Sequence, residues 1–269
     1  LDENGYNIPI ITTLHGTDIT LVGNHPFYKP AVTFSINKSD IVTCVSESLR
    51  DDTREFFGIK RDIEVIPNFI DIDKYDKKHH LCERNMIAQG EEKIIVHISN
   101  FRPLKRIIDV LKIFNKISQK INSKLIMVGD GPEKKKAKDF LRKNDLKNKV
   151  IFLGKTNEVD EILCSSDLFL LPSEKESFGL AALEAMALKI PVISSNVGGL
   201  KELNINGNSG YTSEVGDIES MANNAIEILS NEKLENKFKT QAFENAKKYD
   251  INKVIPLYEA IYKRAIKKS

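Results

Sequence analysis

The stretch from residue 174 to residue 185, EKESFGLAALEA, places two glutamates, Glu176 and Glu184, eight positions apart around a Phe-Gly-Leu. It follows an apolar run, DLFLLPS, which indicates a buried strand, and it continues into residues that favour a helix. Taken alone, the stretch is equally consistent with a surface loop and a helix whose charges only keep it soluble. The rest of the sequence must decide whether this stretch is a solvated helix or a binding element at the end of a strand.

The composition is that of a globular protein with nearly balanced charge. The chain has 269 residues, of which 41% are hydrophobic and 29% are charged, and its formal net charge is +2. This length allows one large domain or two modest ones. The low net charge argues against a nucleic-acid partner, and no apolar run is long enough to span a bilayer.

The N-terminal residues and the cysteines bear on the cellular location. The first residues, LDENGYNIPIITTLHG, lack the basic and then apolar profile of a signal peptide, and they lack an initiator Met, so the chain could be a fragment. Cys44, Cys82 and Cys164 are scattered, with no pair at CxxC or metal-ligand spacing. We therefore expect reduced thiols and a cytoplasmic location.

Short apolar runs bounded by Gly, Pro or Asp alternate with helical patterns along nearly the whole chain. The runs are rich in Ile, Val and Leu without strict alternation, which is typical of parallel strands covered on both faces. Strand and helix in series predict an α/β protein with doubly wound layers. The expected strands are Ile8–Leu14, Asp40–Val45, Ile63–Ile66, Lys93–Ile98, Lys124–Val128, Val150–Leu153, Asp167–Leu171 and Pro191–Ser194.

The alternation is interrupted by a polar stretch between the third and fourth expected strands, and it restarts at Lys93. We therefore expect residues 1–72 to form part of one α/β domain and residues 73–245 to form a second, complete domain. Residues 246–269 carry an amphipathic pattern, IPLYEAIYKRAIKK, and we expect C-terminal helices that pack back toward the first domain.

In open parallel sheets, ligands bind at the carboxyl ends of the strands, so functional residues are expected there. The expected strand ending at Ile98 is followed by SNFRPLKR, which contains Asn100, Arg102 and Lys105. Cations at the start of a helix oppose its dipole, which makes a purely structural role unfavourable. The segment therefore predicts a site for an anionic ligand.

The ends of the next two strands add a turn and a flat surface. The sequence GDGP permits a tight turn with close backbone approach, although this pattern alone is weak. Leu153 and Gly154 in FLGK could offer backbone groups to a flat base.

The stretch 174–185 and the first strand complete the candidate site. If the helix begins near Phe178, its first amides could bind a diphosphate, and Glu176 and Glu184 could accept hydrogen bonds from sugar hydroxyls. His15 ends the first strand in TTLHGTD, where a structural and a functional role are equally consistent with the sequence.

Five motifs in a fixed order resemble retaining GT-B glycosyltransferases of family four: SNFRPLKR, VGDGPE, FLGK, PSEKESFGLAALEAMA and SNVGGLKEL. The resemblance covers essentially the whole chain. It implies an α/β fold of GT-B architecture, with two Rossmann-like doubly wound domains. The N-terminal domain is expected to be incomplete, because the glycine-rich loop after its first strand is absent. The front segment is similar to members that transfer N-acetylglucosamine from UDP-N-acetylglucosamine to L-malate, the first step of bacillithiol synthesis.

The resemblance implies a role for each candidate residue. Arg102 and Lys105 would contact the UDP diphosphate and stabilise the charge on the leaving group. Glu184 would bind the ribose, and Glu176 would hold hydroxyls of the donor sugar. His15 would contact that sugar near the reacting centre. The remaining implied ligands are Phe178, Gly179 and Leu180 for diphosphate or sugar, Leu153 and Gly154 for uracil, and Thr17 and Asp18 for the acceptor.

One departure from the family's pattern affects the cations. Many members have a Gly-Arg pair with a Lys five residues after the Arg, whereas here Asn100 stands in the place of that arginine and Arg102 lies two positions later. The position of Lys105 matches the pattern. We therefore expect Asn100 to contribute to binding and Arg102 to reach the phosphates by a different path.

The resemblance also implies the chemistry. The leaving phosphate would take the proton of the acceptor, so no protein nucleophile, metal or further cofactor is expected. The acceptor would be a small dicarboxylate, and the oligomeric state is open between monomer and homodimer. The alternatives are a family-four hexosyltransferase with a cell-surface glycan or lipid acceptor, a UDP-sugar-binding module without turnover, and a non-hydrolysing UDP-N-acetylglucosamine epimerase. No signature element of the epimerase is visible in the sequence.

Overall fold

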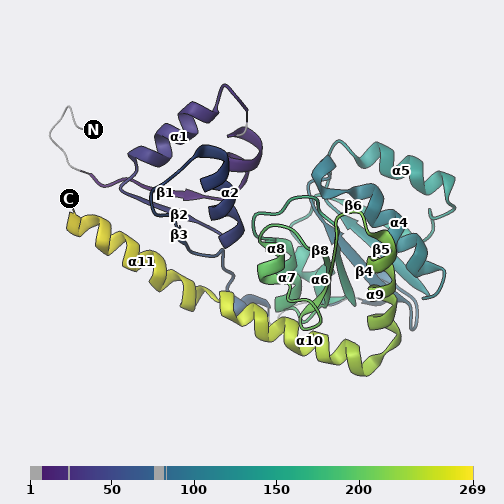
Figure 1. The fold of residues 1–269 in the computed structure, drawn as a ribbon. Coiled ribbons are helices and arrows are strands. Elements are labelled where there is room, and N and C mark those ends of the chain that lie inside the picture. The colour runs from purple at the N-terminus through teal and green to yellow at the C-terminus, as the bar shows by residue number, and fades with distance from the viewer. Residues whose placement is uncertain (1–7, 24, 76–81, 83, 269) are drawn as a thin grey trace. The chain divides into compact units, whose positions relative to one another are not determined.

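The structure, a computed structural model, describes residues 8–23, 25–75, 82 and 84–268 (Figure 1). The chain forms two compact units. The first contains residues up to Ile70, the short segment Glu176–Phe178 and the C-terminal residues from Tyr249. The second contains Asp71–Lys175 and Gly179–Lys248.

The first unit is built on a parallel three-stranded sheet in the order β1-β2-β3. Its helix α2 shows how local sequence sets an element's limits. The Ser46 hydroxyl accepts a hydrogen bond from the Leu49 N–H at 3.1 Å at the start, and Gly58 ends the helix in the left-handed conformation. The elements are β1 (Ile11–Leu14), the π-helix η2 (Asp18–Val22), α1 (Lys29–Lys38), β2 (Ile41–Cys44), α2 (Glu47–Phe57), β3 (Glu64–Val65) and α11 (Ile251–Lys268).

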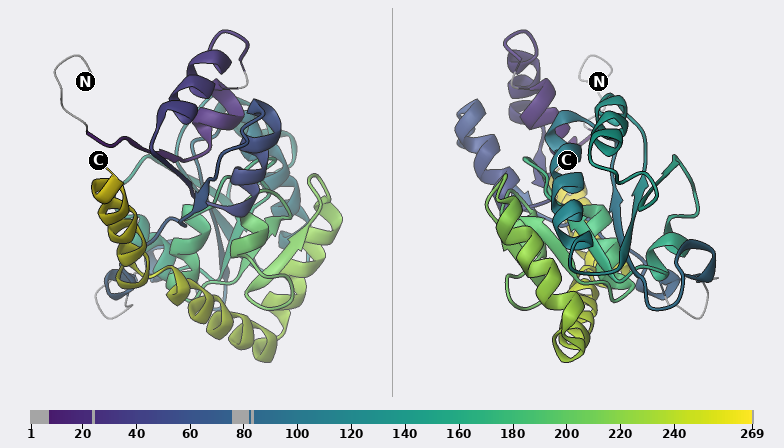
Figure 2. Two further views of the ribbon diagram at one scale, coloured as in Figure 1. Left: turned by 60° about the vertical axis from the view of Figure 1, so that its left-hand side comes forward. Right: turned by 90° about the vertical axis from the view of Figure 1, so that its right-hand side faces the viewer.

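The last helix, α11, contributes to the core of the first unit. Val254, Ile261 and Ala265 on one face of the helix are buried in a cluster with Ile41 and Ile66 of the sheet region. Figure 2 shows α11, in yellow, as a long helix that ends near the C-terminus. The apolar face of this helix is therefore buried by residues that lie near the other end of the sequence.

The second unit is a parallel six-stranded sheet in the order β6-β5-β4-β7-β8-β9. Helix α4 packs between α5 and α9, whereas α7 packs with α6 and α10, and these two groups lie on opposite sides of the sheet (Figure 1). The strands are β4 (Lys93–Ile98), β5 (Ser123–Val128), β6 (Val150–Gly154), β7 (Leu168–Leu171), β8 (Val192–Ser195) and β9 (Gly210–Ser213). The α-helices are α3 (Arg84–Ile87), α4 (Ile107–Ser118), α5 (Lys134–Lys143), α6 (Val159–Cys164), α7 (Leu180–Ala187), α8 (Leu200–Leu203), α9 (Ile218–Ser230) and α10 (Glu232–Ala246). Short 3₁₀ helices are η3 (Ile72–Tyr75), η5 (Pro103–Lys105) and η6 (Lys247–Tyr249).

The predicted α/β class and parallel strands are confirmed. Every expected strand is present with limits that differ by a few residues at most, and all strand pairs are parallel. Strand β7 is completely buried, as its uninterrupted apolar sequence predicts. The strand β9 was not predicted, because its sequence GYTS lacks the Ile, Val and Leu that marked the others.

The expectation of reduced cysteines is wrong for two of the three. Cys82 and Cys164 form a disulfide with their Cα atoms 5.5 Å apart, while Cys44 is a buried thiol that donates to the Ser46 carbonyl at 3.3 Å. The pairing could not be seen in the sequence because 82 positions separate the two residues, and only the fold brings them together. Within the described part of the chain, no helix combines the length and apolarity needed to cross a membrane.

Candidate active site

The strand order of the second unit locates a switch point at its central strands. From β4 the chain adds β5 and β6 on one side, and it then returns to place β7 on the other side of β4. In doubly wound sheets, ligands bind outside the carboxyl ends of the two strands that flank such a reversal. The loops after β4 and β7 are therefore the loops best placed to bind a ligand, and they carry SNFRPLKR and EKESFGL.

The loop after β4 presents cations from a constrained backbone. Arg102 is exposed and extended, with φ −81° and ψ 158°, and Lys105 ends the 3₁₀ turn η5. Phe101 and Arg106, which bracket these cations, have φ values of 42° and 51°, a region that side chains other than glycine rarely adopt. Such strain is typical of functional sites. The predicted residue Asn100 is exposed in the same loop.

The loops after β4 and β7 are joined to each other. The backbone N–H of Glu174 donates to the carbonyl of Leu104 at 2.7 Å. Arg106 forms an ion pair with the Glu174 carboxylate at 3.7 Å and a closer one with Asp109 in the first turn of α4. Arg106 is thus held by carboxylates of the protein, whereas the predicted ligands Arg102 and Lys105 lie between the two strained residues.

Helix α7 begins at Leu180, two residues after the predicted start. Gly179 precedes it with φ 101°, and a Cβ there would lie 2.6 Å from Leu200 Cδ2, so the position requires glycine. The Leu180 side chain is 43% exposed. Glu184 therefore lies in the second turn of this helix, and in the first turn the N–H groups of Ala182 and Leu183 donate to the Gly179 carbonyl at 2.9 and 3.1 Å.

Glu184 occupies a half-buried position beside two residues that sequence reasoning missed. Burial and then the nearby charge of Asp160 raise the pKa of the Glu184 carboxyl to about 7. The Tyr75 hydroxyl donates a hydrogen bond to this carboxylate, which acts in the opposite direction. Burial and the two carboxylates also raise the pKa of Tyr75. No pattern in the sequence links Tyr75 or Asp160 to Glu184.

The glycines after β5 pack against the loop after β4, residues 99–106, which we call the cation loop. A Cβ at Gly129 would lie 1.8 Å from the Ser99 carbonyl oxygen, and one at Gly131 would lie 2.1 Å from that of Asn100. The Gly129 N–H also donates to the carbonyl of Gly154 at 2.7 Å. The GDGP turn therefore brings the ends of β4, β5 and β6 together, and it places Gly154 and the 45% exposed Leu153 at the same edge of the sheet.

In the first unit, the loop after β1 is shaped by Asp18. Its Oδ1 accepts hydrogen bonds from the backbone N–H groups of Gly16 at 2.7 Å and His15 at 3.2 Å. The Ser177 hydroxyl donates to the His15 carbonyl at 2.7 Å. His15 and Thr17 are exposed. The structure therefore brings His15, Thr17 and Asp18 together with the segment that contains Glu176 and Phe178.

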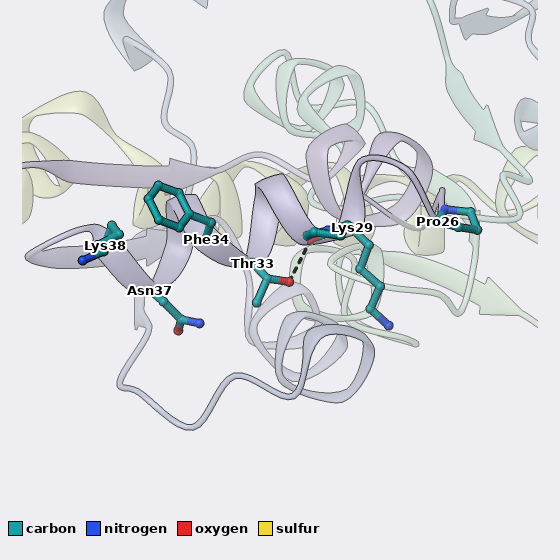
Figure 3. A pocket seen from close by; sticks show the side chains of 7 residues that line it. Pro26, Lys29, Thr33, Phe34, Asn37 and Lys38 are labelled. Atoms are coloured by element: carbon teal, nitrogen blue, oxygen red, sulfur yellow. Dashed lines mark hydrogen bonds between the residues drawn. The ribbon is translucent and has the colours of Figure 1, made fainter.

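A pocket of about 750 Å³ lies on α1 of the first unit, and Figure 3 shows its lining. Thr33 Oγ1 donates to the Lys29 carbonyl at 2.8 Å within the helix, and Phe34 is 64% exposed. None of the residues predicted for the site lines this pocket. The wall is mainly one short helix, and its ionisable residues are two lysines, Lys29 and Lys38.

The comparisons with known proteins agree with the fold. Residues 83–245 match the family model "Glycosyl transferases group 1", and residues 3–74 match "Glycosyltransferase Family 4". N-acetyl-alpha-D-glucosaminyl L-malate synthase of Bacillus anthracis is 43% identical over 260 residues, which are 96% of this chain and 68% of that protein. An uncharacterized glycosyltransferase of Methanocaldococcus jannaschii is 28% identical over 97% of this chain and 70% of its own length.

Solved structures show the same architecture at lower identity. The Anabaena protein HepE in complex with UDP and glucose has a TM-score of 0.84 and 21% identity, over 95% of this chain and 71% of its own. Sucrose-phosphate synthase of Thermosynechococcus elongatus has a TM-score of 0.86 and 18% identity, over 99% of this chain and 70% of its own. These neighbours are GT-B glycosyltransferases, so the fold is GT-B. The chain belongs to the glycosyl transferases group 1 family, with a front segment that matches the family 4 model, and the activity of this family is glycosyl transfer.

Proposed function

We propose that the protein transfers N-acetylglucosamine from UDP-N-acetylglucosamine to L-malate with retention of the anomeric configuration. The meeting of the loops after β4 and β7 at the switch point supports the donor half of this proposal, through the hydrogen bond from Glu174 to Leu104. The acceptor rests on the relative from Bacillus anthracis, whose name gives L-malate. A cytoplasmic location is part of the same proposal, although the Cys82–Cys164 disulfide removes reduced thiols as an argument for it.

The diphosphate would bind between the cations and the start of α7. Arg102 and Lys105 come from the loop after β4, and the first N–H groups of α7 follow the loop after β7. The helix dipole and the cations act in the same sense on an anion. When UDP leaves, each such group stabilises the developing charge by on the order of 3 kcal/mol. Asn100 would add a neutral hydrogen bond where many relatives have a cation.

The nucleoside would bind at the carboxyl edge of the sheet, next to the diphosphate. The ionised Glu184 carboxylate would accept hydrogen bonds from the two ribose hydroxyls. Because the pKa of Glu184 is raised, UDP binding would be sensitive to pH near neutrality. Leu153, which is 45% exposed, and the backbone of Gly154 would contact the uracil ring. Neither contact needs a metal.

The donor sugar and the acceptor would involve the residues of the first unit. His15 and Glu176 would hold the sugar, with the backbone of Phe178, Gly179 and Leu180 near the sugar or diphosphate. Thr17 and Asp18 would lie beside the acceptor. The malate hydroxyl would attack the anomeric carbon on the face from which UDP leaves, and a phosphate oxygen of UDP would take its proton. This route forms the new C–O bond with retention, without a protein nucleophile, a metal or a cofactor.

The test measures UDP release with UDP-N-acetylglucosamine and a panel of acceptors: L-malate, succinate, a cell-surface glycan and a lipid. We expect release with L-malate and none with succinate, which lacks the hydroxyl group, and an α-linked product by NMR coupling constants. UDP release only with a glycan or lipid would show that this molecule, and not L-malate, is the acceptor. Epimerised sugar without any acceptor would indicate an epimerase instead.

A binding measurement separates the donor site from turnover. Titration calorimetry with UDP should show binding by the wild-type chain and a marked loss in Glu184→Ala. UDP binding without release for any acceptor would reduce the function to a UDP-sugar-binding module. A wild-type chain that does not bind UDP would refute the donor site itself.

A further inference from the structure

A buried histidine lies at the switch point, one residue before the end of β4. His97 is fully buried, and burial lowers the pKa of its imidazole to about 4, so the ring is neutral at physiological pH. The pairing of β4 with β7 runs to Val96 and Phe169. At the next position the His97 side chain contacts the Leu170 carbonyl, with Nδ1 2.8 Å from the oxygen. The imidazole therefore links the two strands where the loops of the candidate site begin.

The partners of the imidazole determine its tautomer. A carbonyl oxygen only accepts, so Nδ1 carries the proton and donates to Leu170. Nε2 then accepts, and the Ser99 hydroxyl, 2.8 Å away, donates to it. The Ser99 oxygen in turn accepts from the Phe101 N–H at 3.3 Å. Three hydrogen bonds therefore run in one direction from the cation loop to strand β7.

This chain of hydrogen bonds begins at the first strained residue of the loop. Phe101 has φ 42°, a left-handed conformation that surrounding contacts must maintain. Its buried ring stacks on the His97 imidazole, with centroids 6.2 Å apart and an angle of 26° between the planes. It also packs edge-to-face on Phe152 at 6.2 Å. His97 thus holds both the backbone, through Ser99, and the side chain of Phe101.

The conformation of Phe101 sets the path of the residues that follow it. Arg102 is the next residue, and Lys105 lies three positions further on, before the second strained residue, Arg106. A change at Phe101 would redirect the exposed Arg102. We propose, on the basis of the proposed UDP site, that His97 and Ser99 are positioning residues that hold the cation loop in its diphosphate-binding conformation.

The test compares UDP with uridine, because uridine lacks the diphosphate. In Ser99→Ala, the link between His97 and Phe101 is lost, and we expect UDP affinity to fall about tenfold while uridine affinity changes less than about twofold. Ser99→Thr keeps the hydroxyl and should restore UDP affinity. Both dissociation constants are measured by titration calorimetry or ligand NMR on the 269-residue chain.

A matched control removes a similar hydroxyl from the other end of the sheet. Ser123, at the start of β5, is buried and donates to the Ile121 carbonyl at 3.0 Å. Ser123→Ala should lower the thermal unfolding midpoint about as much as Ser99→Ala and leave both affinities unchanged. If Ser99→Ala lowers UDP and uridine affinity equally, its role is structural and the proposal is wrong.

A second variant tests whether the two residues act together. In His97→Asn, the side-chain amide can donate to Leu170 but is too short to reach Ser99, so the strand link is kept and the loop link is lost. We expect the same tenfold loss of UDP affinity as in Ser99→Ala, and no further loss in the double variant. Independent losses in the double variant, or UDP affinity within twofold of wild type in both single variants, would overturn the proposal. A wild-type chain that binds neither ligand would instead refute the proposed function, and this inference would fail with it.

Discussion

Raising the pH from 5.5 to 8.5 should strengthen UDP binding through ionisation of Glu184. Burial and the charge of Asp160 raise the pKa of this carboxyl to about 7. The carboxyl is therefore mostly protonated at pH 5.5 and mostly ionised at pH 8.5. The free energy of a hydrogen bond to an ionised acceptor is more favourable than that to a neutral acceptor by on the order of 1.4 kcal/mol. This difference corresponds to about tenfold in affinity.

The assay is titration calorimetry with UDP on the wild-type chain and on Glu184→Gln at several pH values. The terminal phosphate of UDP itself titrates near pH ~6, so the ratio of the two dissociation constants at each pH is the useful quantity. The ligand's own titration cancels in this ratio. We expect the advantage of the wild type to grow about tenfold with rising pH, with a midpoint near the pKa of Glu184.

The two neighbours of Glu184 shift the pH of this midpoint in opposite directions. Asp160→Asn removes a charge that raises the pKa, so the midpoint should move to lower pH. Tyr75→Phe removes a hydrogen bond that lowers the pKa, so the midpoint should move to higher pH. Asp139→Asn removes the same charge from an exposed position on α5 and serves as the control. A ratio that does not depend on pH, or a midpoint that stays in place in Asp160→Asn, would refute the reasoning.

Three other predictions concern the same unit. Gly129→Ala should lower the free energy of unfolding in urea by about 3 kcal/mol, because its Cβ would lie 1.8 Å from a carbonyl oxygen at φ 120°. Gly207→Ala, at φ 73° with no atom within 4 Å of the new Cβ, should lower it by only about 1 kcal/mol, and equal losses would contradict the argument from close approach. Lys105→Ala should reduce the turnover number by about 100-fold with a smaller effect on the KM for malate, and an unchanged turnover number in steady-state UDP release would exclude Lys105 from the diphosphate site. Between pH 4.5 and about 7 the native state binds more protons at Glu184 than the unfolded state, so stability should fall as the pH rises through this window. Urea unfolding of Glu184→Gln should show a smaller fall, and identical pH profiles would show that the group does not titrate in this range.

The fold class could be predicted because its signals are local. Runs of Ile, Val and Leu marked the buried parallel strands, and helical patterns alternated with them, so the alternation alone indicated a doubly wound α/β protein. The strand β9 was missed because its pairing with β8, not its own composition, makes it a strand. The motif order pointed to the family through residues such as those of SNFRPLKR and EKESFGLAALEA, and the comparisons confirm the family.

The environment of the candidate site depended on contacts between distant parts of the sequence. The candidate residues could be named because they lie at or after the ends of expected strands, and parallel strands end at one edge of a sheet. The sequence alone therefore determined the class, the family and the loops that carry the candidate ligands. Only the tertiary structure placed β7 beside β4, Tyr75 and Asp160 beside Glu184, and His97 between Leu170 and Ser99. Burial and nearby charge set the pKa of Glu184 and His97, and neither can be read from spacing along the chain.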